Sequence, residues 1–555
     1  MDLNIRIAGE AGQGIKTTGH LLVDVFASMG LWVFSTQSYM SRIRGGLNWQ
    51  DVRVADYRIT SSRDQADLLV ALTEEALETL RAEVAEDGLI LYDGDEAQDA
   101  VAINFTKTAK DEGGSAIMAN SVAGGAIFTI LGYDIKPLIG YLDEAFHAKG
   151  VEVVKTNAAL VRRGAELASD LQGRLPAPQP SDAPPQVYDG TEATALSAAV
   201  SGVKFIAAYP MTPSTGVFTW LAKNMEKYGI IAEQAEDEIA AINMICGATY
   251  AGVPAIVTTS GGGLALMSEG LSLAGMHELP AVVMLGQRPG PATGLPTRTA
   301  QGDLLFALRT GHGEFPRALF APGSPRQCLE LMRRALETAH KFQTPVIYMM
   351  DQYLADLRLN EEERDETPRP IDRQIVTDAG GDYRRYEITD SGVSPRAIPS
   401  GDAFVVLDSD EHDEEGHITE NLEIAQAMMD KRMRKIDGMI AEALPPEAYR
   451  DDEGAGTLLI CWGSTYLPCR EAVDILRMNG HNASMLHFGQ IWPLNRDAVR
   501  EAIGSRERVI SVEGNAWGQF ACVLREQGLI GEVELLTRYD GLPFTAEEIV
   551  ARVEG

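Results

Sequence analysis

The sequence is poor in cysteine. Five cysteines occur in 555 residues, namely Cys246, Cys328, Cys461, Cys469 and Cys522. No two of them form a C-x-x-C pair, and this scattered spacing suits neither a zinc site nor an iron–sulfur cluster. We therefore expect no metal site on this chain. If the protein transfers electrons, its metal centre is expected on another chain.

Positive charge and long apolar runs are also scarce. The chain has 48 Lys+Arg against 80 Asp+Glu, a net charge of −32, which disfavours nucleic-acid binding and requires a local Arg or Lys at any anion site. No apolar run approaches the ~18–20 residues of a membrane span. The N-terminal stretch MDLNIRIAGE lacks the basic and apolar regions of a secretory signal, so a cytoplasmic location is expected.

What the sequence does contain is a repeated alternation of short apolar segments with helical patterns. This alternation predicts an α/β fold, and the early segments read as buried strands of a parallel sheet. A stiff proline-rich stretch, LPAPQPSDAPPQ, and a charged stretch, EEERDETPRPIDR, indicate the domain boundaries. We predict an α/β domain (1–174), a linker (175–186), a second α/β domain (187–355), a charged connector with a long helix (356–455) and a third α/β domain (456–555).

A glycine-rich stretch, AGEAGQGIKTTG, follows the first predicted strand. It is not a Walker A loop, because Lys16 comes one residue too late, and its glycine order reverses the dinucleotide fingerprint G-x-G-x-x-G. Two interpretations stay open: a turn with Gly12 and Gly14 that offers backbone N–H groups to an anion, or a tight turn that binds nothing. The nearby SRIRGG adds Arg42 and Arg44, which favour a phosphate-bearing ligand in this domain.

The second domain places polar residues where predicted strands end. Thr212 stands between two prolines after a strand, Glu238 begins a helix, Ser260 opens a glycine turn, and Arg288 ends a strand. Carboxyl ends of strands are where open α/β sheets bind ligands. Each of three residues also has a purely structural interpretation: Thr212 as part of a plain proline turn, Glu238 as a solvated helix cap and Arg288 as an ordinary surface arginine.

Three stretches carry a resemblance to a known family. They resemble the alpha subunit of 2-oxoacid:ferredoxin oxidoreductases. Their sequences are AAYPMTPST, EDEIAAINMICGATYAGVPAIVTTSGGG and ELPAVVMLGQRPGPATGLPTRTAQGDL. Residues 1–170, with GEAGQGI and SRIRGG, are similar to the family's gamma region. Residues 456–555, with VEGNAWGQ, are similar to its transketolase-C-terminal-like domain. The resemblance implies a doubly wound gamma-type domain, a thiamine pyrimidine-binding domain and the C-terminal domain in that order.

The resemblance also implies an activity. The family decarboxylates a 2-oxoacid oxidatively with coenzyme A, using thiamine diphosphate, and passes electrons to ferredoxin. A beta subunit is expected to carry the diphosphate–Mg²⁺ half of the site and a [4Fe–4S] cluster, in an (alpha–beta)₂ assembly. Glu238 matches the glutamate that bonds N1′ of the aminopyrimidine, and Thr212 and Arg288 match residues that hold the substrate. The expected cofactor contacts are Tyr209, Pro210, Thr212, Glu238, Ser260 and Gly261.

The substrate and the site of coenzyme A are less defined by the resemblance. The stretch GPATGLPTRTAQGDL with GHGEFP looks most like the 2-oxoglutarate branch, and pyruvate or a branched-chain 2-oxoacid is the alternative. A second substrate carboxylate needs a second cation, for which Arg298, His312 and Arg317 are candidates, although each is equally readable as an ordinary loop residue. Coenzyme A is assigned to the glycine loop or to SRIRGG, with Gly12, Gly14, Arg42 and Arg44 as candidates.

Overall fold

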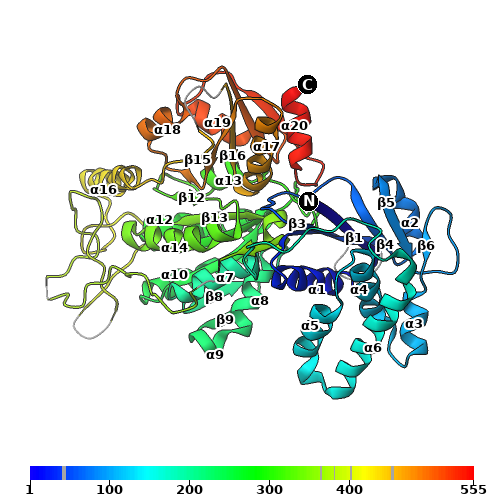
Figure 1. Cartoon of the computed structure of the whole chain (residues 1–555). Coiled ribbons are helices and arrows are strands. Elements are labelled where there is room, and N and C mark those ends of the chain that lie inside the picture. Colours follow the sequence, from blue (N-terminus) through cyan, green and yellow to red (C-terminus); the bar gives the residue numbers. More distant parts are fainter. Residues whose placement is uncertain (40–45, 363–364, 381, 400–402, 452–455) are drawn as a thin grey trace. The chain divides into compact units, whose positions relative to one another are not determined.

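The computed structural model describes residues 1–39, 46–362, 365–380, 382–399, 403–451 and 456–555. The chain divides into two compact units, each of which contains segments that are distant in sequence (Figure 1). Unit 1 consists of Met1–Asp189, Asp356–Arg364 and Thr545–Glu548. Unit 2 consists of Gly190–Ala355, Asp365–Phe544 and Ile549–Gly555.

Unit 1 is built on an eight-stranded sheet of order β6-β5-β4-β1-β3-β2-β14-β7. Its strands are β1 (Asp2–Glu10), β2 (Trp32–Ser38), β3 (Leu47–Ala55), β4 (Ala66–Ala71), β5 (Val84–Tyr92), β6 (Val101–Ala102), β7 (Gln186–Asp189) and β14 (Arg358–Glu361). The predicted parallel pairing holds for β1, β4, β5 and β6. Strand β3 instead pairs antiparallel with both β1 and β2, so the sheet is mixed. The α/β class is confirmed.

The helices of unit 1 pack closely because glycine allows their backbones to approach. They are α1 (Ile15–Ser28), α2 (Glu74–Leu80), α3 (Phe105–Asp111), α4 (Ala119–Ile130), α5 (Lys136–Phe146) and α6 (Val151–Leu167). A Cβ on Gly125 of α4 would lie 2.0 Å from the Val161 carbonyl oxygen, and one on Gly164 of α6 would lie 1.9 Å from that of Val122. Substitution of either glycine would push α4 and α6 apart.

Unit 2 contains a seven-stranded sheet of order β18-β12-β13-β11-β10-β8-β9. Its strands are β8 (Phe205–Ala208), β9 (Ile231–Gln234), β10 (Ala255–Ser260), β11 (Val282–Gln287), β12 (Ala318–Phe320), β13 (Val346–Asp351) and β18 (Gln490–Trp492). All neighbours are parallel except β12 and β18. The register sets Ser260 opposite Gly286, and Gln287 opposite Asp351, so these residues share the carboxyl edge of the sheet.

A second sheet of unit 2 has the order β15-β17-β16-β19-β20. Its strands are β15 (Glu447–Tyr449), β16 (Thr457–Trp462), β17 (Ala483–Phe488), β19 (Arg508–Glu513) and β20 (Glu534–Thr537). Helices after residue 189 are α7 (Gly190–Val200), α8 (Thr215–Lys223), α9 (Met225–Tyr228), α10 (Glu238–Tyr250), α11 (Gly261–Leu266), α12 (Ser268–Met276), α13 (Leu304–Arg309), α14 (Pro325–Phe342), α15 (Gln352–Asp356), α16 (Leu422–Ala441), α17 (Tyr466–Met478), α18 (Arg496–Ile503), α19 (Gln519–Glu526) and α20 (Ala546–Glu554).

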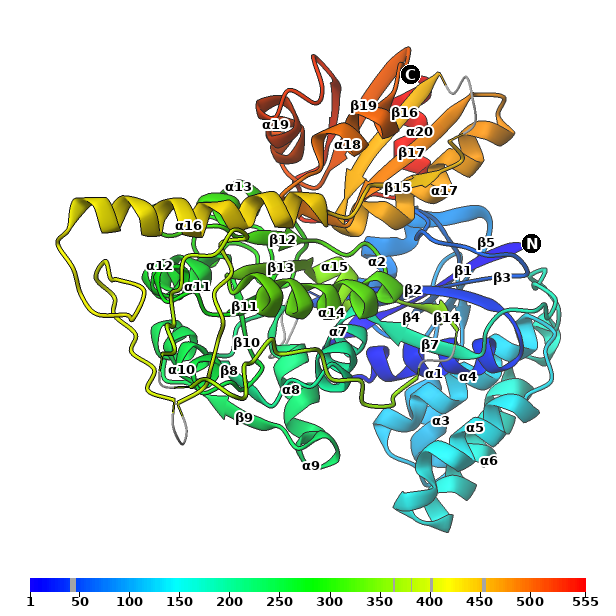
Figure 2. The same cartoon turned by 90° about the vertical axis from the view of Figure 1, so that its left-hand side faces the viewer.

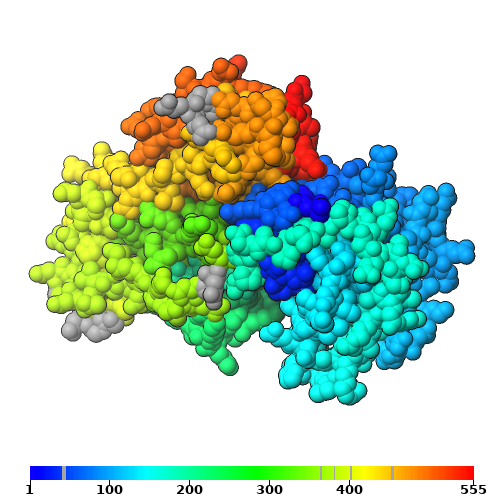
Figure 3. Space-filling view, in the orientation of Figure 1, coloured from blue at the N-terminus to red at the C-terminus, as the bar shows by residue number. Residues whose placement is uncertain are grey.

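The segment predicted as a single connector, 356–455, has two different parts. Its first strand, β14, belongs to the sheet of unit 1, where it pairs antiparallel with β2 and β7. Strand β7 also belongs to that sheet, although the sequence places residues 187–189 in the second domain. The segment Asp365–Phe544 belongs to unit 2, and its first part is visible in yellow-green on the face shown in Figure 3. The predicted long helix is α16, which contacts α14 (Figure 2).

Helix α16 is fixed to unit 2 by buried charges. Lys431 donates to Glu278 Oε1 at 2.7 Å, and Lys435 forms an ion pair with the other carboxylate oxygen of Glu278. All three side chains are essentially inaccessible to solvent. Buried charges are tolerated only when they are paired, so the part of the connector that carries α16 is an integral part of unit 2.

Within the described ranges, no single helix combines the length and the apolar character that a membrane span requires.

Candidate active site

The loop after β8 carries Thr212 and packs on the end of β11. A Cβ on Gly286 would lie 2.9 Å from Pro213 Cγ and from the Ser214 nitrogen, so glycine is needed there for the two backbones to approach. The Ser214 hydroxyl donates to the Met211 carbonyl at 2.8 Å and closes the turn. Thr212 is thereby held at the carboxyl edge of the sheet, and the two exposed residues before it, Tyr209 and Pro210, extend from the same edge.

Glu238 is the first residue of α10 and is buried, with 3% of its surface exposed. The residue that caps α10 is Asp237, whose Oδ1 accepts from the Ala240 N–H at 2.7 Å. Of the two interpretations left open by the sequence, the structure favours the buried acid. Glu238 Oε1 accepts no hydrogen bond from any residue described here, which is costly for a buried oxygen unless a ligand supplies the donor.

The glycine turn after β10 makes room for this carboxylate. A Cβ on Gly263 would lie 2.7 Å from both Cγ and Oε1 of Glu238. Ser260, at the end of β10, is fully buried, and its hydroxyl has no hydrogen-bond partner in the described part of the chain. Gly261 then starts α11. Unpaired polar atoms of Ser260 and Glu238 therefore border the same helical turn.

Arg288 follows β11 and is tied to the loop of Thr212. Its Nη1 donates to the Thr212 carbonyl oxygen at 2.9 Å. Burial lowers the pKa of Arg288, and the negative charge of Asp303 partly offsets this effect. Burial likewise raises the pKa of Asp303 to about 6, against the opposing influence of Arg288. A half-buried guanidinium at the carboxyl edge is suited to bind the carboxylate of a small acid.

Sequence reasoning did not single out Asp303. It lies in the stretch AQGDL, immediately before α13. Aspartate is common as a helix cap at such a position, so its place in the sequence did not by itself suggest another role. Its Oδ1 would lie 2.6 Å from a Cβ on Gly261, which places its carboxylate against the first turn of α11. A signal was present, because an acid among small residues in a loop that follows Arg288 is a candidate charge partner.

Of the three cations predicted for a second substrate carboxylate, the structure brings only one to this edge. Arg298 lies in the loop between β11 and α13, on the carboxyl side of the sheet. Arg317 precedes β12, whose first residue pairs with Val346 at the start of β13, so it lies at the amino edge. It stacks on Phe315 and donates to the Thr310 carbonyl. His312 lies five residues before Arg317, with an exposed side chain and backbone hydrogen bonds to the Ser272 hydroxyl.

The glycine loop of unit 1 forms a turn between β1 and α1. The Gln13 N–H donates to the Glu10 carbonyl at 3.2 Å, and its side-chain oxygen accepts from the Glu10 N–H at 2.7 Å. Gly12 and Gly14 have positive φ values of 98° and 79°, which favour glycine, and Gly14 is the N-cap of α1. Arg42 and Arg44 lie outside the described residues.

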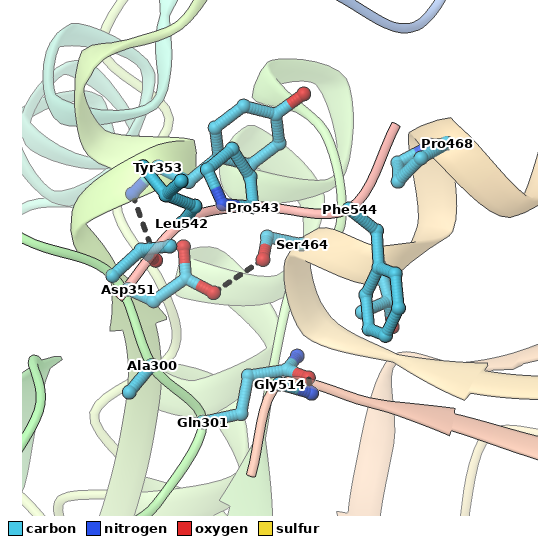
Figure 4. A pocket seen from close by; sticks show the side chains of 12 residues that line it. Ala300, Gln301, Asp351, Tyr353, Ser464, Pro468, Gly514, Leu542, Pro543 and Phe544 are labelled. Atoms are coloured by element: carbon cyan, nitrogen blue, oxygen red, sulfur yellow. Dashed lines mark hydrogen bonds between the residues drawn. The ribbon is translucent and has the colours of Figure 1, made fainter. Parts of the chain in front are cut away.

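A small cavity of about 20 Å³ lies beside the site within unit 2, with room for about one water molecule (Figure 4). Asp351, at the end of β13, is fully buried there, and the Ser464 hydroxyl donates to it. The Leu354 N–H also donates to Asp351, at 2.9 Å. Burial, opposed by these hydrogen bonds, raises the pKa of Asp351 to about 6. This carboxyl connects the end of β13, in the seven-stranded sheet, to the turn after β16, in the five-stranded sheet. The sequence did not indicate this contact.

Comparisons with known proteins match the whole chain. Residues 4–167 match the family described as pyruvate ferredoxin/flavodoxin oxidoreductase. Residues 197–431 match the family described as pyruvate flavodoxin/ferredoxin oxidoreductase, thiamine diP-bdg. The two families thus cover the glycine loop and the candidate active site respectively.

Individual relatives align with this chain over most or all of both sequences. The alpha subunit of 2-oxoacid:ferredoxin oxidoreductase 2 from Aeropyrum pernix is 30% identical, covering 100% of this chain and 97% of that protein. The 2-oxoglutarate oxidoreductase subunit KorA of Mycobacterium tuberculosis is 28% identical, covering 98% and 90%. The solved 2-oxoglutarate:ferredoxin oxidoreductase from Magnetococcus marinus, with 2-oxoglutarate, coenzyme A and succinyl-CoA bound, has a TM-score of 0.92 and 32% identity, covering 100% and 99%.

Proposed function

Because this chain belongs to the 2-oxoacid:ferredoxin oxidoreductase family, as an alpha subunit with a gamma-type region at its start, we propose that it oxidises 2-oxoglutarate. The proposed reaction is coenzyme A-dependent decarboxylation to succinyl-CoA and CO₂, or its reductive reverse. One observation carries the proposal: the buried Glu238 has a carboxylate oxygen that no described residue satisfies, at the edge where Arg288 also lies.

The residues present fit the aminopyrimidine of thiamine diphosphate. A nitrogen heterocycle with a ring N–H and an exocyclic amine would supply partners for the Glu238 carboxylate and the Ser260 hydroxyl, which lack them otherwise. When bound, this cofactor supplies the carbon nucleophile and the electron sink of the reaction. Glu238 would hold a proton at the ring nitrogen, and burial of its side chain keeps water from competing for that proton.

Arg288 and Thr212 would bind the 2-oxoacid. The hydrogen bond between them uses one of the donors of the guanidinium, which leaves the others for the carboxylate of the substrate. A local cation is needed because the chain carries a net charge of −32, which repels anions at a distance. Fixing the guanidinium before the substrate arrives also reduces the entropy lost on binding.

The preference for 2-oxoglutarate rests on the need to bind a second carboxylate. Arg298 is the one predicted cation that shares the carboxyl edge with Arg288, so we assign the second carboxylate to it. Relatives named for 2-oxoglutarate support this assignment. Other relatives carry only the general name 2-oxoacid:ferredoxin oxidoreductase, and pyruvate or a branched-chain 2-oxoacid is the second candidate.

The remaining parts of the reaction need other groups. We propose that a beta subunit holds the diphosphate with Mg²⁺ and carries a [4Fe–4S] cluster that passes electrons to ferredoxin, in an (alpha–beta)₂ complex in the cytoplasm. Coenzyme A is assigned to unit 1. Gly12 supports this assignment, because a Cβ placed on it would meet no atom of the described residues within 4 Å, which leaves space for a ligand beside the turn.

A substrate panel on the co-purified complex tests the proposal. With coenzyme A and an artificial viologen acceptor, we expect kcat/KM for 2-oxoglutarate to exceed that for pyruvate and for 2-oxoisovalerate at least about tenfold. Arg298→Ala is expected to raise KM for 2-oxoglutarate and to leave that for pyruvate unchanged. Arg309→Ala, which removes an exposed arginine paired with Glu526, is the matched control. Equal kcat/KM values for the three acids would contradict the substrate assignment.

A further inference from the structure

Asp303 occupies a helix-capping position but does not cap. It immediately precedes α13, where an aspartate normally accepts a hydrogen bond from the first turn, yet its side chain accepts none. The carboxylate lies instead against Gly261, with Oδ1 2.6 Å and Oδ2 2.9 Å from the position of a Cβ on that residue. Sequence rules that fail locally in this way are most often found at functional sites.

The C-terminal domain holds the segment of Asp303 in place. Gln301 exchanges two hydrogen bonds with Gly514, each of 2.7 Å, and its Nε2 donates to the Trp462 carbonyl at 2.7 Å. Gln519 binds both sides of Asp303, because its amide donates to the Gly302 carbonyl at 2.8 Å and accepts from the Leu305 N–H at 3.0 Å. The orientation of Asp303 is therefore fixed by a second domain of the same unit.

The carboxylate of Asp303 has unused bonding capacity. Its Oδ2 is inaccessible to solvent and has no hydrogen-bond partner among the residues described. Arg288 influences it electrostatically, but no ion pair within 4.0 Å joins the two residues in the described structure. The other charged or titratable residues placed at this edge are Glu238, at the start of α10, Asp351, at the end of β13, and Arg298, in the loop between β11 and α13. Helix α11 (GGGLAL) and Gln287 present no charge. Two opposite charges are thus held apart at the place where the substrate carboxylate is expected.

We propose that Asp303 is a positioning residue that sets the affinity of Arg288 for the 2-oxoacid. In the empty site its charge stabilises the half-buried guanidinium. When a substrate carboxylate binds to Arg288, the same charge repels it and so weakens binding. The inference rests on the proposed function, since it assigns the 2-oxoacid to Arg288.

The charge of Asp303 predicts a direction for each variant. Asp303→Asn keeps the shape and removes the charge, so KM for the 2-oxoacid at pH 8 is expected to fall about fivefold, with a smaller change in kcat. Because burial raises the pKa of Asp303 to about 6, KM of the wild-type complex should fall as the pH decreases through 6. In Asp303→Asn that change is expected to be absent.

Two further variants separate the effect of charge from that of structure. Gly261→Ala keeps the charge but displaces the carboxylate, and is expected to move KM in the same direction as Asp303→Asn. Asp351→Asn removes a second buried carboxyl at the same edge, one already bonded to Ser464, and is expected to leave KM and its pH profile unchanged. A structural defect alone would not reproduce this pattern.

The experiment uses the complete alpha–beta complex, with kinetics from pH 5.5 to 8.5 and calorimetric titration with glutarate, a dicarboxylate that cannot be decarboxylated. We expect Asp303→Asn to bind glutarate more tightly at pH 8 and equally at pH 5.5. An unchanged or raised KM, together with an unchanged glutarate affinity, would overturn the role of Asp303. Failure of the wild-type complex to oxidise any 2-oxoacid would instead overturn the proposed function, so the two failures are distinguishable.

Discussion

Arg288 Nη1 donates to the carbonyl oxygen of Thr212 at 2.9 Å, across 76 residues of sequence. The bond joins the loop after β8 to the end of β11, and the strand between them, β10, carries Ser260. Three neighbouring strands therefore contribute to one edge. The position of the guanidinium depends on a backbone atom, so side-chain replacement of Thr212 does not remove this contact.

Replacement of Arg288 is expected to affect mainly substrate binding. Arg288→Lys keeps the charge but loses the planar fork that holds both Thr212 and a carboxylate. We expect KM for the 2-oxoacid to rise at least about tenfold, a loss of ~1.4 kcal/mol or more, with thiamine diphosphate affinity unchanged. Steady-state kinetics and cofactor titration check this, and an unchanged KM would exclude Arg288 from the substrate site.

Replacement of Glu238 is expected to abolish the reaction without preventing folding. Glu238→Gln is isosteric and keeps a hydrogen-bonding oxygen, but it cannot exchange a proton with the ring nitrogen. Loss of general acid–base catalysis usually costs about 100-fold to 10,000-fold in rate, so viologen reduction should fall by at least ~100-fold. Size-exclusion chromatography should show the complex intact. Turnover close to that of the wild type would refute the role given to Glu238.

Gly263 and its neighbour Gly262 form a matched pair. Gly263→Ala places a Cβ 2.7 Å from Glu238 Oε1 and 2.0 Å from Thr259 Oγ1, whereas a Cβ on Gly262 meets no atom within 4 Å in the described part of the chain. Overpacking of this kind costs ~1–3 kcal/mol and must displace the carboxylate. We expect thiamine diphosphate affinity to fall about tenfold in Gly263→Ala only. Equal affinities in the two variants would show that Glu238 does not depend on this turn.

The stability contributed by Asp351 is expected to depend on pH. The folded state keeps this carboxyl protonated up to about pH 6, whereas the unfolded chain releases the proton near its ordinary pKa of 3.8. Wild-type stability should therefore fall as the pH rises from 4 to 6, by ~2 kcal/mol from this group. Asp351→Asn lacks this dependence. The difference in unfolding free energy between Asp351→Asn and the wild type should therefore shift in favour of the variant by the same amount between pH 4 and pH 6. Urea denaturation of both proteins at several pH values would measure this shift.

The buried charges under α16 are expected to matter most when only one is removed. Burial opposes ionisation of Glu278, but the charges of Lys435, Lys431 and Arg385 outweigh this and lower its pKa. Glu278→Gln leaves two buried lysines unpaired and should destabilise unit 2 by ~3–5 kcal/mol. The triple variant Glu278→Leu, Lys431→Met, Lys435→Met should be less destabilised than the single one in urea unfolding. The reverse order would contradict the need for pairing.

The sequence predicted that the candidate site residues share the carboxyl edge of one sheet, but it did not predict the charges around them. Thr212, Glu238, Ser260 and Arg288 each follow or precede a recognisable strand or helix, so local patterns were enough to place them at one edge. The contact of Asp303 with Gly261 was not predicted, because Gly261 lies 42 residues earlier in the sequence and only tertiary packing brings the two residues together. No local pattern encodes a contact of that separation.

The positions of the three candidate cations could not be predicted from the sequence either. Arg298, His312 and Arg317 lie close in sequence, but the chain passes from the carboxyl edge to the amino edge between Arg298 and β12. In unit 1, the alternation of apolar segments predicted a parallel sheet, yet β3 pairs antiparallel with its neighbours. Strand direction depends on the path of the connecting chain and not on the composition of the strand.

The sequence by itself determined the α/β class, the family and the strand ends that carry the candidate site residues, because these depend on local periodicity and on contiguous motifs. Only the tertiary structure decided that Asp237 and not Glu238 caps α10, that β14 returns to the sheet of unit 1, and that Asp303 faces Gly261. The physical reason is that burial, hydrogen-bond satisfaction and electrostatic coupling arise from contacts between distant segments, which exist only once the chain has folded.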